Sequence, residues 1–308
     1  MSRWLLLLLV AGPASAYDSG RAAFSVRVDD LVIPYRTFAV FVLPAEQFDI
    51  EVIGSGAPAV LYTSAGKATA VSERNWLATA PSRPGAYAIT IRRGQDRMQL
   101  NVVVMHPSSK VVNGRLNGFR IGAYPARALN GDPIYLPPDG FIDLNAKTAA
   151  LALSPHFALS QFPSKQPGGY PKYLVLQERL LLKLELLLEQ VNARGFPADT
   201  LTIMSGYRTP WYNETIKNVP YSRHVYGGAA DVFVDIVAPD GIMDDLNRDG
   251  RTDHRDAQTL YAWAHGLYGR HEHRRLRGGL GVYDATPAHG PFLHIDARGK
   301  RARWGLLP

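Results

Sequence analysis

The chain has 308 residues, no cysteine and a formal net charge of +7. The absence of cysteine excludes disulfides, thiolate ligands and a lipid-modified cysteine, so any metal must bind through His, Asp or Glu. This length predicts two domains, and 46% hydrophobic residues are enough for a real core. The basic surplus suits a polyanionic partner such as cell wall, lipid head groups or extracellular nucleic acid, but it is explained equally well by solubility.

Residues 1–16 have the features of a cleaved signal peptide. Arg3 precedes an apolar run from Trp4 to Ala11 that is too short to span a bilayer, and the segment ends in Ala-Ser-Ala. Cleavage would make Tyr17 the first residue and, with Arg3 removed, lower the charge from +7 to +6. We therefore expect an exported protein, periplasmic or extracellular. No transmembrane segment is expected, because the leucine-rich residues 174–191 carry five charged side chains.

Residues 17–108 show the period-two hydrophobic pattern of half-buried strands. The turn sequences "GSGAP" and "PSRPG" separate these strands at a spacing typical of a sandwich. We expect an immunoglobulin-like β-sandwich that binds or spaces, followed by a linker rich in Gly, Pro and Asn over 109–139. The alternating apolar positions are Phe24, Val26 and Val28; Phe38, Val40 and Val42; Phe48, Ile50 and Val52; Tyr87, Ile89 and Ile91; and Leu100, Val102 and Val104.

Residues 140–308 form the second predicted domain. A helix over about 173–193 is predicted by a leucine stripe that ends before Gly195, and its role is packing. The segment "TLTIMSGYRTP" then predicts a strand that ends at Ser205-Gly206 and places Arg208 at the edge of a sheet.

Three residues in this domain have the chemistry of metal ligands. His224 and Asp231 lie seven residues apart in "SRHVYGGAAD", where Gly and Ala allow a tight turn and close packing. His294 in "GPFLHIDARG" is the third candidate, on a short strand. A catalytic zinc site needs three such ligands and an open position for water.

Together these motifs resemble the D-Ala-D-Ala carboxypeptidase family of zinc metallopeptidases, in the group that includes lysostaphin and sonic hedgehog. The resemblance rests on Ser205-Gly206-Tyr207-Arg208, "SRHVYGGAAD", and "FLHIDARG" followed by "ARWG". It covers roughly residues 140–308 and implies an α+β zinc domain, with zinc held by His224, Asp231 and His294. It also implies peptidoglycan stem peptides as substrate, and an arginine, Arg208, that receives a substrate carboxylate or polarises the scissile carbonyl.

The general base departs from the family pattern. Better-known members place a glutamate three residues before the last histidine ligand, and this chain has Pro291 there. Asp296 and His289 are the nearest candidates, and Asp296 is equally suited to orienting His294. The missing glutamate favours the alternative of a non-catalytic wall-binding or structural metalloprotein, whereas Arg208 and the complete ligand set favour an enzyme. Carboxypeptidase and endopeptidase activity both remain open.

A second metal is predicted by "DLNRDGRTDHRD", residues 245–256. Its oxygen donors have EF-hand spacing, Gly250 occupies the sharp-turn position, and the loop resembles the calcium loops of dockerin modules. A helix is expected after the loop and none before it, and an acidic surface loop is the alternative. The predicted calcium ligands are Asp245, Asn247, Asp249, the backbone carbonyl of Arg251, Asp253 and Asp256.

The basic run "GRHEHRRLRGG" is the remaining distinctive segment. It could contact nucleic acid, and His271 and His273 could bind a metal. Two histidines among four arginines more often form a solvated loop, so no nucleic-acid partner is expected.

Overall fold

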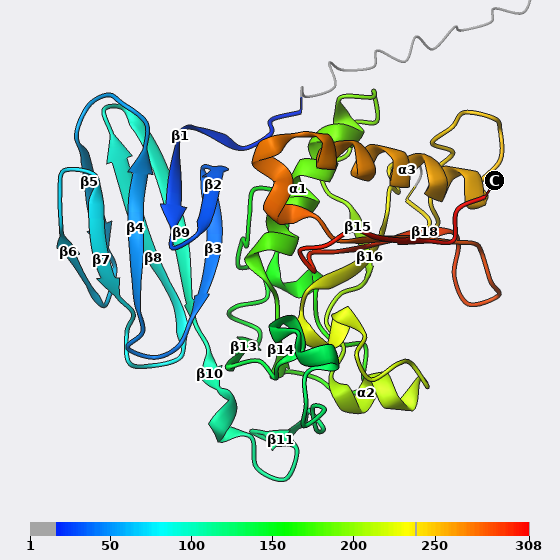
Figure 1. Ribbon diagram of the computed structural model, residues 1–308, viewed down its shortest axis with the longest axis horizontal. Coiled ribbons are helices and arrows are strands. Elements are labelled where there is room, and N and C mark those ends of the chain that lie inside the picture. The colour runs from blue at the N-terminus through cyan, green and yellow to red at the C-terminus, as the bar shows by residue number, and fades with distance from the viewer. Residues whose placement is uncertain (1–16, 238, 308) are drawn as a thin grey trace, which may run out of the picture.

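The computed structural model describes residues 17–237 and 239–307, so the predicted signal peptide lies outside the described residues. The architecture is mostly β-sheet with few helices (Figure 1). Two sheets form one side of the molecule in Figure 1, and a second unit with the longer helices forms the other. Within the described part of the chain, no helix has the length and apolar character needed to cross a membrane.

The first unit is a sandwich of two sheets, with strand orders β2-β1-β4-β7-β6 and β3-β9-β8-β5. The predicted alternation is confirmed: Phe24, Val26 and Val28 are buried between polar neighbours, and the other four predicted runs also lie in strands. The strands are β1 (Arg21–Val28), β2 (Leu31–Tyr35), β3 (Thr37–Val42), β4 (Gln47–Ile53), β5 (Ala59–Thr63), β6 (Lys67–Ala70), β7 (Asn75–Thr79), β8 (Gly85–Arg93) and β9 (Asp96–Val104).

The second unit is built on a five-stranded sheet with the order β15-β16-β18-β17-β19. Two helices, α1 (Glu178–Asn192) and α3 (His254–Gly266), cover one face of this sheet, and the short helix α2 (Pro210–Thr215) lies on the other side (Figure 1). The strands are β15 (Thr202–Ser205), β16 (Ala229–Phe233), β17 (Gly279–Tyr283), β18 (Phe292–Asp296) and β19 (Ala302–Trp304).

A smaller sheet joins the two units. It consists of β10 (His106–Pro107), β13 (Gly140–Leu144) and β14 (Lys172–Leu174). The helix predicted to begin near residue 173 therefore begins at Glu178, because Leu174 pairs with Ile142 as strand before the chain turns into α1. The helix predicted after the acidic loop is confirmed as α3, where Leu260 and Ala264 are fully buried.

The predicted linker, 109–139, packs against the second unit. It contains the hairpin β11 (Arg115–Leu116) and β12 (Phe119–Arg120) and three 3-10 turns. The hydroxyl of Tyr124 contacts the Tyr207 hydroxyl at 2.9 Å and donates to the carbonyl of Val225 at 3.1 Å. The segment therefore helps to support the loops around the candidate metal ligands.

The sandwich packs directly on α1. Arg21 pairs with Glu189 at 2.8 Å, and the Tyr35 hydroxyl donates to the same carboxylate at 2.9 Å. Arg179 of α1 pairs with Asp30 in the turn between β1 and β2. Because one continuous hydrophobic core includes residues of both units, α1 is buried by the sandwich on one side and by the sheet and α3 on the other.

Candidate metal centre and cleft

The three predicted metal ligands meet at one buried point. The Nε2 atom of His224 lies 3.1 Å from Oδ1 of Asp231 and 3.2 Å from Nδ1 of His294, and the last two atoms are 2.9 Å apart. All three side chains are less than a tenth exposed. Among the described residues, this is the only group of His, Asp or Glu donors brought close enough together to hold a metal ion.

Neighbouring elements place these side chains. Asp231 in β16 and His294 in β18 are direct cross-strand partners, so their side chains leave the same face of the sheet. His224 comes from a one-turn 3-10 helix, Arg223–Tyr226, that ends at Gly227. Gly227 has a φ of +64°, and a Cβ atom there would lie 2.4 Å from the carbonyl oxygen of Val175, so the turn requires glycine. Asp231 is the third of the five residues of β16.

Hydrogen bonds select which histidine nitrogen faces the centre. The Nδ1–H of His224 donates to the carbonyl of Gly206 at 2.7 Å, which leaves Nε2 with its lone pair. The Nε2 atom of His294 lies 3.3 Å from Oδ2 of Asp296, which leaves Nδ1 for a metal. Burial also lowers the pKa of His224, which favours the neutral, metal-binding form.

Asp231 is held as a carboxylate. Burial by itself would raise its pKa, but the neighbouring His224 and His294 outweigh this and hold the pKa well below its usual range. Its second oxygen, Oδ2, accepts a hydrogen bond of 2.6 Å from Arg208, whose Nε donates to Ser205 Oγ at 2.9 Å. The predicted substrate arginine thus contacts a metal ligand directly.

The carboxylate of Asp296 lies behind His294, on the ring nitrogen that faces away from Asp231. It is fully buried, and it accepts hydrogen bonds from the guanidinium of Arg298, the shortest at 2.6 Å, and from the Gly279 N–H at 2.8 Å. Burial would raise the pKa of Asp296, but His294 and Arg298 together hold it well below the usual range. Asp296 therefore stays ionised and keeps His294 in one orientation.

The donor set fits zinc. A tetrahedral zinc ion with bonds of 2.0–2.1 Å separates its ligand atoms by about 3.3 Å, which is close to the spacing found here. Two imidazoles and one carboxylate also leave a fourth position for water. The chemistry of the donors shows that the site can hold a metal ion.

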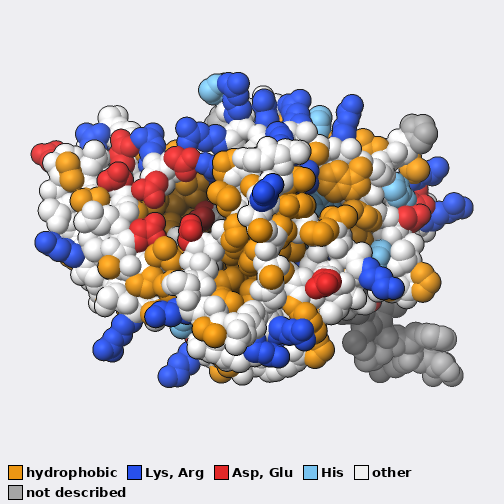
Figure 2. Space-filling model, turned by 60° about the horizontal axis from the view of Figure 1, so that its bottom comes forward, with side chains coloured by type: hydrophobic (Ala, Val, Ile, Leu, Met, Phe, Trp, Pro, Cys, Tyr) orange, Lys and Arg blue, Asp and Glu red, His pale blue; other side chains and the backbone are white. Residues whose placement is uncertain are grey.

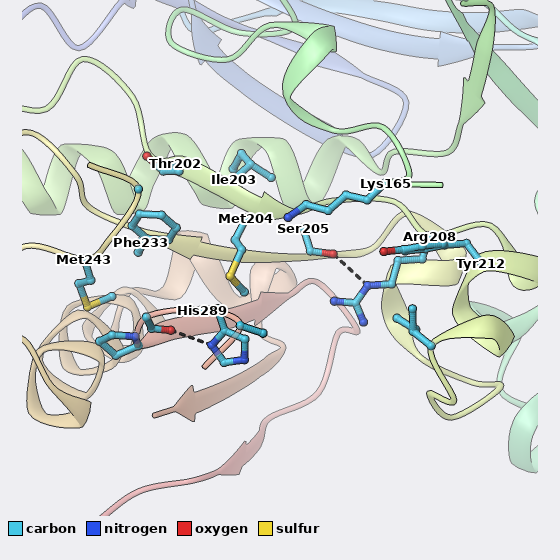
Figure 3. Close-up of a pocket in the computed structure, with 15 residues that line it drawn as sticks. Lys165, Thr202, Ile203, Met204, Ser205, Arg208, Tyr212, Phe233, Met243 and His289 are labelled. Carbon is cyan, nitrogen blue, oxygen red and sulfur yellow. Dashed lines mark hydrogen bonds between the residues drawn. The ribbon is translucent and has the colours of Figure 1, made fainter. Parts of the chain in front are cut away.

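A cleft of about 500 Å³ lies beside the centre. Arg208 and His289 both line it, and their side chains turn toward its middle (Figure 3). Tyr212 of α2 and the exposed Lys165 also line it. His289 is half-buried, and its Nδ1 atom lies 2.8 Å from the carbonyl oxygen of Gly290. On the face turned forward in Figure 2, hydrophobic side chains gather at the centre and lysines and arginines stand around the rim.

Several residues that support the site were not predicted from the sequence. Arg298 holds Asp296, and the buried Lys183 of α1 donates to the carbonyl oxygen of Asp296 at 2.6 Å. The Trp304 ring lies against His294, with 5.2 Å between ring centroids. Arg298 lies two residues from Asp296 in the same motif, but only the folded strands reveal a contact with Lys183, 113 residues away.

The predicted calcium loop turns at Gly250, which has a φ of +84°. Asp245 accepts hydrogen bonds from the N–H groups of Asp249 and Gly250, and Asp253 caps α3. Asp256 differs from the prediction: it is fully buried, and its carboxylate accepts three backbone N–H bonds, from Leu246, Asn247 and Asp253. The acidic side chains therefore do not converge on one point as His224, Asp231 and His294 do.

Comparisons with known proteins leave the family open. No family model matches the chain, and no curated protein matches its sequence. Among solved structures, the chain is similar to domain I10 of titin, with 12% identity, 27% of this chain and 94% of that chain covered, and a TM-score of 0.18. It is also similar to the S-layer protein rSbsC(31-844), with 15% identity, 28% and 14% coverage, and a TM-score of 0.18. These scores are too low to support any argument about function.

Proposed function

We propose that this protein is a zinc-dependent peptidase that acts on peptidoglycan stem peptides, as a D-Ala-D-Ala carboxypeptidase or as an endopeptidase. The observation that carries the proposal is the buried group of His224 Nε2, Asp231 Oδ1 and His294 Nδ1, which Arg208 connects to a cleft of about 500 Å³. The sequence motifs that resemble the D-Ala-D-Ala carboxypeptidase family surround these same three residues, in a hedgehog-like α+β domain. The predicted export signal suits a substrate outside the cytoplasm.

Zinc at this site would act as a Lewis acid and make water a nucleophile near neutral pH. The bonds to Gly206 and Asp296 hold the two histidines with their lone pairs turned toward the centre. Arg208 lies between Asp231 and the cleft, so its guanidinium can stabilise negative charge on the substrate while it fixes the ligand carboxylate. The exposed Lys165 adds a second cation to the cleft, which suits a peptide with a carboxylate.

We assign proton transfer to His289 and orientation of His294 to Asp296. His289 is the predicted base candidate that lines the cleft, where a substrate amide would lie. The oxygens of Asp296 are already engaged by Arg298, Gly279 and His294, and they lie on the far side of the histidine ring. Asp296 is therefore a positioning residue.

The proposal is tested by incubating the purified protein with peptidoglycan fragments and detecting released D-alanine or cleaved peptides by mass spectrometry. We expect cleavage that is lost with a chelator and restored by zinc. His224→Ala should show neither cleavage nor bound zinc. His271→Ala changes an exposed histidine that belongs neither to the metal centre nor to the cleft lining, so it is the matched control and should keep both. Fragments that bind the zinc-loaded protein without being cleaved would favour the non-catalytic wall-binding alternative.

We also propose that residues 245–256 bind one calcium ion. EF-hand spacing and the glycine turn support this proposal. Asp245, Asn247 and Asp249 are the first three ligands of the loop. Asp256 closes the loop through its backbone contacts. Calorimetry on the zinc-loaded protein should show one calcium site that Asp249→Ala removes and Asp284→Ala keeps. If no binding occurs at millimolar calcium, residues 245–256 are only a polar loop that precedes and caps α3.

A further inference from the structure

A large groove lies at the junction of the sandwich and the second unit. It has a volume of about 1110 Å³, at the upper end of the usual range for ligand sites, and it shares no lining residue with the zinc cleft. The turn between β1 and β2 forms one wall, α1 forms the floor, and the 3-10 helix His271–Leu276 forms the other wall. Junctions between domains are common places for ligand sites.

The floor of the groove is apolar. Leu182 and Leu186 of α1 and Leu276 of the 3-10 helix line it, each almost completely buried beneath the groove surface. On the β2 wall, Pro34 also lines it, and Val32 is 42% exposed. An apolar ligand in the groove would cover the exposed part of Val32 and the outermost atoms of the three leucines, which removes apolar surface from water.

The rim of the groove is cationic. Six arginines line it against three carboxylates among the described residues. Asp30 is shared by Arg179 and Arg275, Glu189 holds Arg21, and Glu51 pairs with Arg27, so carboxylates position four of these six guanidinium groups. The side chain of Arg274 is exposed and has no described partner. This wall comes from the basic run "GRHEHRRLRGG", which has no role in the zinc centre.

We propose that this groove binds an anionic lipid, with its phosphate among the arginines and the first part of its acyl chain on the leucine floor. A guanidinium group can bind two phosphate oxygens at once, so the arginines of the rim suit a phosphate group. A hydrophilic polyanion would not use the apolar floor, and a neutral lipid would not use the arginines. The groove thus holds the protein at a lipid surface independently of the reaction in the cleft.

The test is titration of the full protein with dioctanoyl phosphatidylglycerol below its micellar concentration, followed by calorimetry. We expect saturable binding at one site, at least about tenfold tighter than for dioctanoyl phosphatidylcholine or inorganic phosphate. Arg274→Gln and Val32→Asn should each weaken binding several-fold. The matched controls, Arg83→Gln and Val71→Asn, change exposed residues of the same types outside the groove and should bind as the unchanged protein does.

Melting temperatures of all four variants establish that each remains folded. Equal affinity for phosphatidylcholine and phosphatidylglycerol would overturn the role of the arginines. Phosphate binding as tight as lipid binding would overturn the role of the floor. A short oligonucleotide that displaces the lipid with higher affinity would replace the proposal with a polyanion site. Binding that Arg274→Gln and Val32→Asn both leave unchanged would place the lipid elsewhere.

Discussion

The His294 side chain is held from both sides of its ring. Its Nδ1 atom faces His224 and Asp231, and its Nε2 atom faces Asp296, which Arg298 and the Gly279 N–H hold in turn. Second partners of this kind fix the tautomer and direction of a metal-binding histidine.

Asp296→Asn should therefore weaken zinc binding by about 10- to 100-fold, because the amide no longer orients and polarises His294 as a carboxylate does. Turnover at saturating zinc should change little. Competition with a chromogenic chelator measures the affinity, and Asp284→Asn serves as the control. A fall in turnover of about 10²- to 10⁴-fold at full zinc occupancy would instead identify Asp296 as the general base.

Arg208 contacts Asp231 in the structure, and we propose that it also binds the substrate. Bound zinc allows these two roles to be separated. Arg208→Ala leaves the buried Asp231 carboxylate without its guanidinium partner, and an unpaired buried charge is strongly destabilising. Bound zinc compensates that charge. We expect a large loss of activity and a fall in melting temperature that is greater without zinc than with it. Arg83→Ala, on the sandwich surface, should change neither, and equal destabilisation in both states would contradict the contact with Asp231.

At the scale of elements, the turn from the His224 helix into β16 depends on Gly227. Gly227→Ala would introduce both the strain of a positive φ and a clash with the Val175 carbonyl. Gly94→Ala, in the turn between β8 and β9, introduces only the strain, since its φ is +61° with nothing within 4 Å.

Gly227→Ala should therefore lower the melting temperature more than Gly94→Ala, and it alone should lower zinc content, because His224 and Asp231 flank the turn. Thermal unfolding and zinc analysis of the two variants measure this. Equal shifts with full zinc in both would mean that the turn adjusts without moving the ligands.

At the scale of the whole molecule, His156 joins the segment that precedes β1 to α1. Its Nδ1 lies 2.7 Å from the buried Glu185 carboxylate and its Nε2 lies 3.0 Å from the carbonyl oxygen of Asp18. Burial lowers the pKa of His156, but the hydrogen bond and charge of Glu185 outweigh burial and raise it above 6.5. The charged histidine thus helps to hold the sandwich against the second unit.

Because the pKa of His156 is higher in the folded state, its contribution to stability is complete below about pH 6.5 and is lost as the pH rises through the folded-state value. The difference in unfolding free energy between the unchanged protein and His156→Gln should be larger at about pH 6 than at about pH 9. Urea unfolding at the two pH values measures it, and His271→Gln should show no such change. A difference independent of pH would show that the contact acts without its charge.

Much of the organisation was predictable where chemistry and structure depend on near neighbours in sequence. Period-two patterns predicted five strands of the sandwich, leucine spacing predicted α1 except for its start, and the acidic loop pattern predicted a helix after it, which is α3. The site ligands were predictable because His224, Asp231 and His294 are metal-competent residues in motifs whose glycines allow a close turn. The sandwich is confirmed as two packed sheets, whereas the immunoglobulin-like label, zinc as the metal and peptidoglycan as the substrate remain predictions.

Long-range packing set the rest. The sequence left Asp296 as either base or orienter, and the register between β16, β17 and β18 places it behind His294. Asp256 was predicted as a calcium ligand from spacing, yet α3 carries it inward to backbone donors. Arg275 contacts Asp30, 245 residues away in sequence, and this contact joins two walls of the groove for which we propose a lipid. A local pattern states which chemistry a side chain offers, but its direction and partners depend on contacts between segments that no local pattern encodes.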